Sequence, residues 1–293
     1  MPELPEVETI RLGLQKYLVG KKLESVDLKL PRIVKGGRLE DLVGSTVSCV
    51  RRFGKVLVLD FNPSTGGRAP TAGLSLVVHI KLTGQIIYRP DESKVPNVPK
   101  VSKAKVGTLP NKWTHMILGF SDGTKLYYND LRQFGWIRVI PTKSVESFKF
   151  IQELGPEPFG ELTAEKFKEI IGKKKTKIKP LLLDQTLIGG VGNIYANDAL
   201  NLAKIDPRRP ANSLSESEQI KLYEALLEVL GRGLKYGGAS ELTYVNSFGE
   251  EGKYQEHFLV YARTGKPCKN CGESIKKIML AGRGTFYCEN CQK

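Results

Sequence analysis

The first hydrophobic pattern of the chain has the period of an α-helix. Val7, Ile10, Leu14 and Leu18 recur at intervals of three or four residues, and Gly20 follows the last of them. Residues at this spacing lie on one face of a helix, and a glycine just after the last turn is typical of a helix end. The pattern predicts one amphipathic helix at the N-terminus.

From about residue 26 to residue 140 the helical spacing gives way to a period of two and to short apolar runs. Such runs, separated by glycine and proline, are typical of strands with a buried face. We expect strands at 26–30, 47–49, 56–61, 74–80, 86–88, 116–120, 126–128 and 136–140. Eight or so strands indicate a β-sandwich or barrel. The stretches 62–73 and 89–112 are rich in Pro, Gly, Ser and Lys, which predicts long mobile loops.

The character of the chain changes again at the Leu-Gly-Pro-Glu-Pro segment 154–158, where we place a domain boundary. Helical spacing returns after it, with Thr163 as the expected cap of one helix. Further helices are expected near 179–183, at 193–203 and from Ser215 to about residue 234. Strands followed by helices predict an α+β fold.

Four of the five cysteines lie close to the C-terminus as Cys268, Cys271, Cys288 and Cys291. This C-x2-C-x16-C-x2-C spacing is typical of a zinc site. Four thiolates leave no open coordination position, so one zinc ion would hold structure and would not activate water. Free thiols or two disulfides are the alternative. The chain starts without a basic segment followed by an apolar one, so nothing favours secretion and an oxidising compartment.

The charge balance indicates a polyanionic partner. The chain has 45 Lys and Arg against 31 Asp and Glu, a net charge of +14. Such an excess favours nucleic acid, although general basicity, as in some thermophiles, is an alternative. No apolar run is long enough to span a membrane. With only 3 His residues, a histidine-rich catalytic metal site is not expected.

A glycine-rich turn at 187–193 leads directly into an expected helix, and free amides at a helix start favour phosphate. It is not a P-loop, because no Lys-Ser or Lys-Thr follows the glycines. The basic run 173–179 lies just upstream. A charge run is often only a solvated surface, but beside an anion-binding turn we expect it to follow a nucleic-acid backbone.

Pro2 and Glu3 offer a different chemistry. Removal of Met1 would leave a secondary amine at the chain start. An N-terminal amine titrates near pH 8 and lysine near 10.4, so its nucleophilic fraction is about two orders of magnitude larger. A proline amine that condenses with a sugar carbon gives an iminium, which accepts electrons during elimination. The alternative is that Pro2 only starts the helix and Glu3 only favours its dipole.

The segment Met1 to Thr9, MPELPEVET, together with GVGNIY at 190–195 and the four-cysteine array, resembles the formamidopyrimidine-DNA glycosylase family. The similarity runs along the whole chain. The resemblance implies an N-terminal β-sandwich domain with an N-terminal helix at 1–145. It also implies a helix-two-turns-helix DNA-binding domain at 150–240 and a C-terminal zinc finger at 255–293. Members grip duplex DNA and flip the damaged base out.

The resemblance also assigns roles to residues of this chain. Pro2 is implied as the nucleophile and Glu3 as the acid/base. Lys55 matches the lysine of β-elimination, and Arg283 matches the finger arginine of δ-elimination. Phosphate-binding positions are matched by His79, Lys174 and Asn193.

Members fill the hole left by the flipped base with a Met, Arg and Phe trio. Arg132 and Phe134 match this trio, whereas Leu82 stands at the Met position. Leucine is apolar and of similar volume, so we expect it to fill the hole. Trp113 stands where a DNA-contacting His is often found. The segment 243–254 matches the loop that covers the flipped base.

The resemblance therefore implies a bifunctional glycosylase and abasic-site lyase for oxidised purines. The expected partner is duplex DNA bearing oxidised bases or abasic sites, the expected cofactor is one structural Zn²⁺, and we expect a monomer in a prokaryotic cytoplasm, associated with the nucleoid. The nearest rival is an endonuclease VIII type of enzyme for oxidised pyrimidines, against which Leu4 argues because that branch usually has Gly there. A non-catalytic nucleic-acid-binding zinc protein is the second rival.

Overall fold

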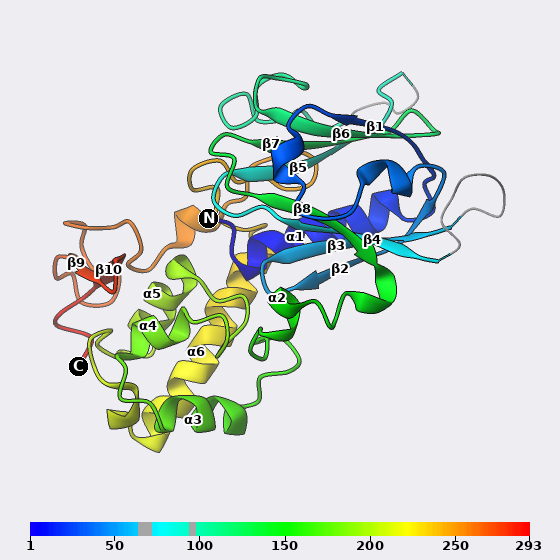
Figure 1. The fold of residues 1–293 in the computed structure, drawn as a ribbon. Coiled ribbons are helices and arrows are strands. Elements are labelled where there is room, and N and C mark those ends of the chain that lie inside the picture. Colours follow the sequence, from blue (N-terminus) through cyan, green and yellow to red (C-terminus); the bar gives the residue numbers. More distant parts are fainter. Residues whose placement is uncertain (64–71, 94–97) are drawn as a thin grey trace. The chain divides into compact units, whose positions relative to one another are not determined.

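The computed structural model describes residues 1–63, 72–93 and 98–293 and divides the chain into two compact units. The first unit contains residues 1–152 and 236–253, and the second contains 153–235 and 254–293. The chain therefore completes the first unit only after it has built most of the second. In Figure 1, the rainbow colouring follows the chain through both units.

The first unit consists of two four-stranded antiparallel sheets and helix α1 (Leu4–Leu18), drawn in blue in Figure 1. One sheet has the order β1-β6-β7-β5, with β1 (Leu23–Leu28), β6 (Thr114–Phe120), β7 (Lys125–Asp130) and β5 (Gly84–Arg89). The other has the order β2-β3-β4-β8, with β2 (Thr46–Phe53), β3 (Val56–Asn62), β4 (Leu74–His79) and β8 (Trp136–Pro141). The eight predicted strands and the N-terminal helix are confirmed.

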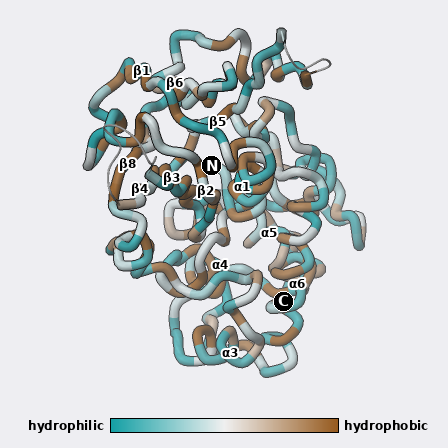
Figure 2. Tube along the Cα trace, turned by 90° about the vertical axis from the view of Figure 1, so that its right-hand side faces the viewer, coloured by the Kyte–Doolittle hydropathy of each residue, from teal (hydrophilic) through white to brown (hydrophobic). Residues whose placement is uncertain are grey.

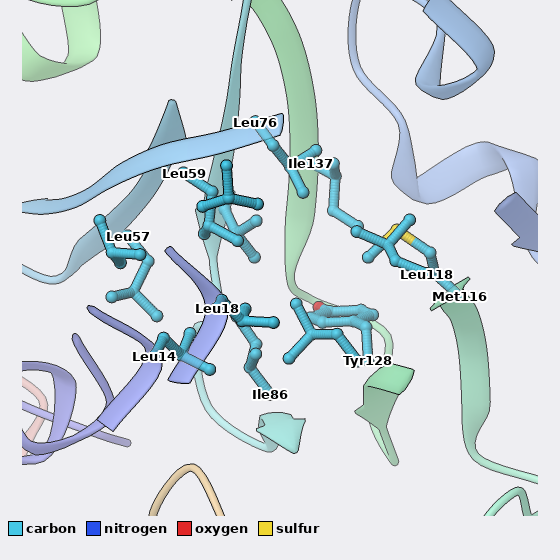
Figure 3. Close-up of a cluster of buried hydrophobic side chains, with 14 of the residues drawn as sticks. Leu14, Leu18, Leu57, Leu59, Leu76, Ile86, Met116, Leu118, Tyr128 and Ile137 are labelled. Carbon is cyan, nitrogen blue, oxygen red and sulfur yellow. The ribbon is translucent and has the colours of Figure 1, made fainter. Parts of the chain in front are cut away.

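The core of this unit lies where side chains of α1 and both sheets meet. Figure 3 shows Leu14 and Leu18 of α1 beside Leu57 of one sheet and Ile86 and Tyr128 of the other. Leu14 and Leu18 are fully buried. Burial of a leucine contributes about 1.5–3 kcal/mol, so the apolar face of α1 holds the N-terminus in a fixed position.

Several short elements were not predicted, because they contain too few turns to show a period. They are the 3-10 helices η1 (Pro31–Ile33), η2 (Leu39–Leu42) and η3 (Thr142–Ser144), and the four-residue helix α2 (Lys149–Gln152). The expected loop 62–73 lies largely outside the described residues, which resume at 72.

The described residues 98–112 form a loop without helix or strand, as predicted, but their apolar side chains are packed, which the prediction did not include. Val101, Val106 and Leu109 pack in a hydrophobic cluster with Ile87 of β5 and Val245. Val106 is buried. Apolar side chains spread through a segment rich in Pro, Gly and Lys thus give it a fixed conformation.

The second unit is helical and carries a β-hairpin. Its helices are α3 (Ala164–Gly172), α4 (Ile178–Leu182), α5 (Asn193–Leu202) and α6 (Glu216–Lys235), with the 3-10 helices η4 (Ala211–Ser213) and η5 (Tyr254–His257) and the strands β9 (Lys276–Leu280) and β10 (Arg283–Tyr287). Thr163 caps α3 as predicted, since its Oγ1 accepts from the Lys166 N–H at 3.2 Å. Figure 2 shows hydrophilic and hydrophobic residues alternating along α3, as a half-buried helix requires. Within the described residues, no helix is long and apolar enough to cross a membrane.

A buried carboxylate joins α5 to the segment that leads to the hairpin. Asp198 accepts from the backbone N–H groups of Leu259, Val260 and Tyr261 at 3.0–3.1 Å. Burial raises its pKa, against the lowering effect of these hydrogen bonds. The three amides would otherwise lack partners in a buried place, so Asp198 sets the path of the chain into the hairpin.

Candidate functional site

The start of α1 is built around two buried carboxylates. The Glu3 N–H donates to Glu6 Oε2 at 2.8 Å, and the Ala239 N–H donates to Glu6 Oε1 at 2.8 Å. Glu3 is 3% exposed and Glu6 is 1% exposed. Glu6 therefore holds both the backbone of Glu3 and a segment more than two hundred residues later in the chain.

The amino terminus lies within electrostatic range of these carboxylates and of a lysine. Burial lowers the pKa of the Met1 amino group, Glu3 and Glu6 raise it, and Lys55 lowers it further, with the net result below its usual value of 8.0. A lower pKa enlarges the neutral, nucleophilic fraction of an amine. Pro2 is itself buried, so an amine exposed there by loss of Met1 would start from the same surroundings.

Lys55 is buried on the turn between β2 and β3, after Gly54, whose φ is +56°. Arg52 fixes this turn to α1: its Nη1 donates to the Gly54 carbonyl at 2.9 Å, and its Nε donates to Glu8 Oε2 at 2.8 Å. The turn thus buries a lysine whose charge acts on the amino terminus, although its sequence alone favours an exposed strand lysine.

His79 ends β4 and is buried. The Lys81 N–H donates to His79 Nδ1 at 3.0 Å, so the proton of the neutral ring lies on Nε2. Burial, followed by the charges of Lys81 and Lys55, lowers the pKa of His79 to about 3. The ring is therefore neutral at physiological pH and offers one N–H donor, not a positive charge.

Two turns that carry predicted DNA-contacting residues are joined by Asp130. Its Oδ2 accepts from the Gly135 N–H at 2.8 Å and its Oδ1 from the Arg132 N–H at 3.2 Å. Thr83, which follows Leu82, donates its hydroxyl to the same carboxylate. One buried acid thereby brings the Leu82 turn next to the turn of Arg132 and Phe134.

The side chains at these turns are available to a partner. Phe134 is 55% exposed, which is unusual for a large apolar residue, and the Arg132 guanidinium lies 4.7 Å from the centre of its ring. Leu82 is half-buried. Trp113 is also half-buried, and its carbonyl accepts from the Asp130 N–H at 3.0 Å. Four predicted contact residues therefore lie around one buried aspartate of the first unit.

The second unit gathers a separate set of predicted residues. Asn193 begins α5, and its Nδ2 donates to the Gly284 carbonyl at 3.1 Å. Arg283 is exposed at the start of β10, directly before Gly284. Lys174 is exposed in the basic run, and its carbonyl accepts from the Asn212 N–H at 3.0 Å.

Lys179 connects the start of α5 to the hairpin and was not singled out from the sequence. It is fully buried, and its Nζ donates to Asn193 Oδ1 at 2.7 Å, the Gly284 carbonyl at 3.0 Å and Thr285 Oγ1 at 2.8 Å. The expectation that the whole run 173–179 follows a nucleic-acid backbone is therefore wrong for its last lysine. Residues 172–177 are exposed. Lys179 instead fixes Asn193 and the backbone of Gly284, which directly follows Arg283.

Replacement of Lys179 by methionine is expected to destabilise the second unit by about 2–4 kcal/mol, because three buried acceptors lose their donor. Thermal and denaturant unfolding would measure this loss. Lys177→Met is the matched control, since it removes the same charge from an exposed position of the same segment. Equal midpoints for the two variants would contradict the structural role of Lys179.

The four predicted cysteines lie together in the second unit. Their Sγ atoms are all within 4.8 Å of one another, with 4.0 Å between Cys268 and Cys291 and 3.5 Å between Cys271 and Cys288. Zinc binds thiolate sulfur at about 2.3 Å in a tetrahedron, which requires sulfur atoms about 3.8 Å apart. The donor set and its spacing therefore fit one zinc ion with no open position.

Family models match all three parts of the chain. Residues 1–137 match the formamidopyrimidine-DNA glycosylase N-terminal domain, residues 154–244 the H2TH domain of the same enzymes, and residues 265–293 a zinc finger found in them and in IleRS. The chain is 38% identical to the formamidopyrimidine-DNA glycosylase of Pelotomaculum thermopropionicum over 100% of its own length and 99% of that protein. This chain belongs to the formamidopyrimidine-DNA glycosylase family.

Other members of the family agree over the full length. The Streptococcus mutans formamidopyrimidine-DNA glycosylase is 37% identical, with 100% of both chains covered. The wild-type Lactococcus lactis Fpg (MutM), solved in complex with DNA containing N7-benzyl-Fapy-dG, is 35% identical with a TM-score of 0.84, and both chains are covered to 100%. The predicted family and α+β fold are thereby confirmed, as is the four-cysteine zinc finger.

Within this glycosylase family fold, sequence reasoning missed the residues that place the others. Two of them, Glu6 and Lys179, bond to groups far away in the chain. The third, Asp130, bonds to the backbone of the turn that follows it. Each reads in the sequence as an ordinary charged residue. What distinguishes these three residues from other charged residues is that they are buried, and burial of a single charged residue cannot be recognised from the sequence.

Proposed function

We propose that this chain removes oxidised purines, chiefly 8-oxoguanine opposite cytosine and formamidopyrimidines, from duplex DNA and then cleaves the strand by β,δ-elimination. The observation that carries the proposal is the half-buried amino terminus whose pKa is lowered by burial and shifted by the buried residues Glu3 and Lys55, in a chain whose relatives along its full length are formamidopyrimidine-DNA glycosylases. The activity is a step of base excision repair.

In the proposed reaction, Pro2 is the nucleophile after removal of Met1. Its nitrogen forms a bond to C1′ as the bond from C1′ to the damaged base breaks, and the base leaves with that electron pair and a proton. Glu3 serves as the acid/base, protonating the ribose ring oxygen so that the ring opens to an iminium. The iminium accepts the electron pair of the C2′–H bond as that proton leaves, which gives an enamine. The enamine then expels the 3′ phosphate, which departs with the electron pair of its bond to C3′.

Lys55 and Arg283 are proposed to serve the elimination steps. The charge of Lys55 lowers the pKa of the amino terminus, which supports a role for this lysine near the proposed iminium. Arg283 is exposed on the zinc-finger hairpin and is proposed to contact phosphate and to assist δ-elimination. Bound zinc would supply only the folding energy of this hairpin.

The remaining residues are proposed to hold the DNA. His79, Lys174 and Asn193 would bind phosphates, with His79 donating from Nε2 as a neutral ring. Leu82, Arg132 and Phe134 would occupy the space that the extruded base leaves, offsetting an unstacking cost of a few kcal/mol. Trp113 replaces a polar contact by an aromatic surface on which a base or sugar can stack.

Borohydride trapping on an 8-oxoguanine duplex tests the proposal. Reduction of the iminium is expected to leave a covalent protein–DNA adduct that peptide mapping assigns to Pro2. Intact-mass measurement establishes in the same preparation whether Met1 has been removed. Absence of an adduct from protein that begins at Pro2 would contradict the mechanism and favour a non-catalytic DNA-binding protein.

The choice of substrate distinguishes the proposed activity on oxidised purines from the rival activity on oxidised pyrimidines. A duplex panel that contains 8-oxoguanine, formamidopyrimidine and thymine glycol in the same sequence context compares the two classes. We expect faster removal of both purine lesions. Faster removal of thymine glycol would instead assign the chain to an endonuclease VIII type of activity.

We further propose that the protein acts as a monomer on nucleoid DNA in the cytoplasm, as its expected substrate requires.

A further inference from the structure

Residues 236–253 of the first unit form a loop whose two ends are fastened together. The Lys253 N–H donates to the Tyr236 carbonyl at 2.8 Å, and the Gly252 N–H donates to Ser240 Oγ at 2.8 Å. A Cβ on Gly252 would lie 2.3 Å from the Gly238 carbonyl oxygen, so only glycine permits this approach. Such closed loops are compact and often functional.

This 236–253 loop borders the amino terminus. Ala239 is bonded to Glu6, the carboxylate that also holds the Glu3 backbone. A Cβ on Gly238 would lie 2.9 Å from Glu6 Cγ, which shows how closely the loop meets α1. Glu241 is near enough to raise the pKa of the amino terminus. The loop is therefore one wall of the proposed reaction site.

The described part of the β5–β6 connection, residues 98–112, holds the outer side of this wall. Lys105 Nζ donates to the Leu242 carbonyl at 2.7 Å. Gln85 Nε2 donates both to the Lys105 carbonyl at 3.0 Å and to the Thr243 carbonyl at 2.6 Å. Two successive carbonyls of the 236–253 loop are thus fixed in direction, and so are the peptide groups to which they belong.

A second group of contacts secures the far half of the same loop. The Ser102 N–H donates to the Gly249 carbonyl at 2.7 Å, and Ser102 Oγ donates to Glu251 Oε1 at 2.6 Å. Val106 packs against Val245 in the hydrophobic cluster. The connection therefore contacts the 236–253 loop near Leu242 and Thr243 and again near Gly249 and Glu251, through backbone, side chain and apolar surface.

The contact leaves space at its inner edge. A cavity of about 260 Å³ is lined by Thr83, Lys105, Trp113, Leu242 and Thr243, among other residues. Leu242 is 58% exposed there. The fixed backbone, the exposed leucine and the tryptophan surround a space beside Thr83, which follows Leu82.

We propose that residues 98–112 are a brace that fixes the 236–253 loop before DNA arrives, with Lys105 as its positioning residue, and that this brace serves base removal and not strand cleavage. The inference rests on the proposed function. Removal of a base requires that the base be held beside the amino terminus, so a mobile wall costs rate in that step. An abasic site has no base to hold, so its cleavage does not depend on the wall.

Lys105→Met tests the brace, because methionine keeps the stem and removes the donor to Leu242. In single-turnover assays we expect excision of 8-oxoguanine to fall about tenfold, while cleavage of a preformed abasic duplex stays within about twofold. Amide hydrogen exchange at 242–245 is expected to accelerate in the free protein. Lys105→Arg, which keeps a donor, is expected to restore most of the excision rate.

Lys100→Met is the matched control, since Lys100 is exposed in the same connection and its loss changes the net charge equally. We expect wild-type rates and exchange from it. Unchanged exchange in K105M, or equal losses on the 8-oxoguanine and abasic duplexes, would overturn the brace. Failure of the wild-type protein to excise 8-oxoguanine would overturn the proposed function instead, and the exchange measurement would still decide whether the brace exists.

Discussion

Replacement of Glu3 by glutamine is expected to lower the rate of 8-oxoguanine excision by about 10²- to 10⁴-fold, the usual contribution of a positioned proton donor. Glutamine keeps the shape of the side chain and cannot transfer a proton. The fold at this point should persist, because the amide oxygen of glutamine can still accept from the Glu6 backbone N–H in the capping box, and the Glu3 backbone N–H still donates to Glu6 Oε2. Single-turnover rates on an 8-oxoguanine duplex would measure the loss.

Two comparisons make this prediction specific. Glu24→Gln removes an equal charge from an exposed position on β1 and should leave the rate unchanged. Thermal unfolding of E3Q should coincide with that of the wild type within a few degrees. A wild-type excision rate in E3Q would show that another group, with Glu6 the nearest candidate, transfers the proton.

Loss of zinc is expected to abolish DNA binding while the first unit stays folded. The hairpin module has a small core: Val260, Ile275 and Phe286 pack with three of the cysteines, Cys268, Cys288 and Cys291. Zinc binding to such modules is worth about 10–16 kcal/mol, far more than so few apolar residues supply. Without the ion the hairpin should unfold, and Arg283 and Gly284 would lose their defined positions.

The measurement is zinc content and affinity for a lesion duplex after Cys268→Ser. We expect less than one zinc per chain. We also expect the affinity for the lesion duplex to fall at least about a hundredfold, because the contacts of the finger with DNA phosphates are lost. Cys49→Ser is the internal control, because Cys49 lies on β2, outside the four-cysteine cluster. Normal affinity in a zinc-free C268S protein would disprove this assignment of the finger.

The sequence predicted those helices and strands whose apolar residues recur at a regular spacing or form short runs. Helix α1 buries one face, which appears as a repeat of apolar residues, whereas strands such as β3 and β4 are buried on both faces and appear as short apolar runs. The basic run shows the limit of this reasoning. Lys179 and its exposed neighbours are the same residue type, and only the path of the chain decides that Lys179 meets Gly284, 105 residues away.

The β5–β6 connection shows a second limit. Its composition predicted a loop, which is correct as far as helices and strands are concerned, but composition says nothing of partners. Lys105 and Leu242 are 137 residues apart and meet through a backbone carbonyl, which every residue type carries. The roles proposed for Pro2 and Glu3, by contrast, rest on the chemistry of a terminal amine and on the family resemblance.

The division of the chain has a consequence for its synthesis. The last strand of the first unit ends at Pro141, yet the loop that completes this unit starts at Tyr236. At about 5–20 residues per second, a ribosome needs roughly 5–20 s to make the intervening residues. Until then Glu6 lacks the Ala239 amide, and the wall beside the amino terminus does not exist. A nascent chain therefore lacks one wall of the proposed reaction site until residues 236–253 have been made, by which time residues 153–235 of the second unit have been made as well.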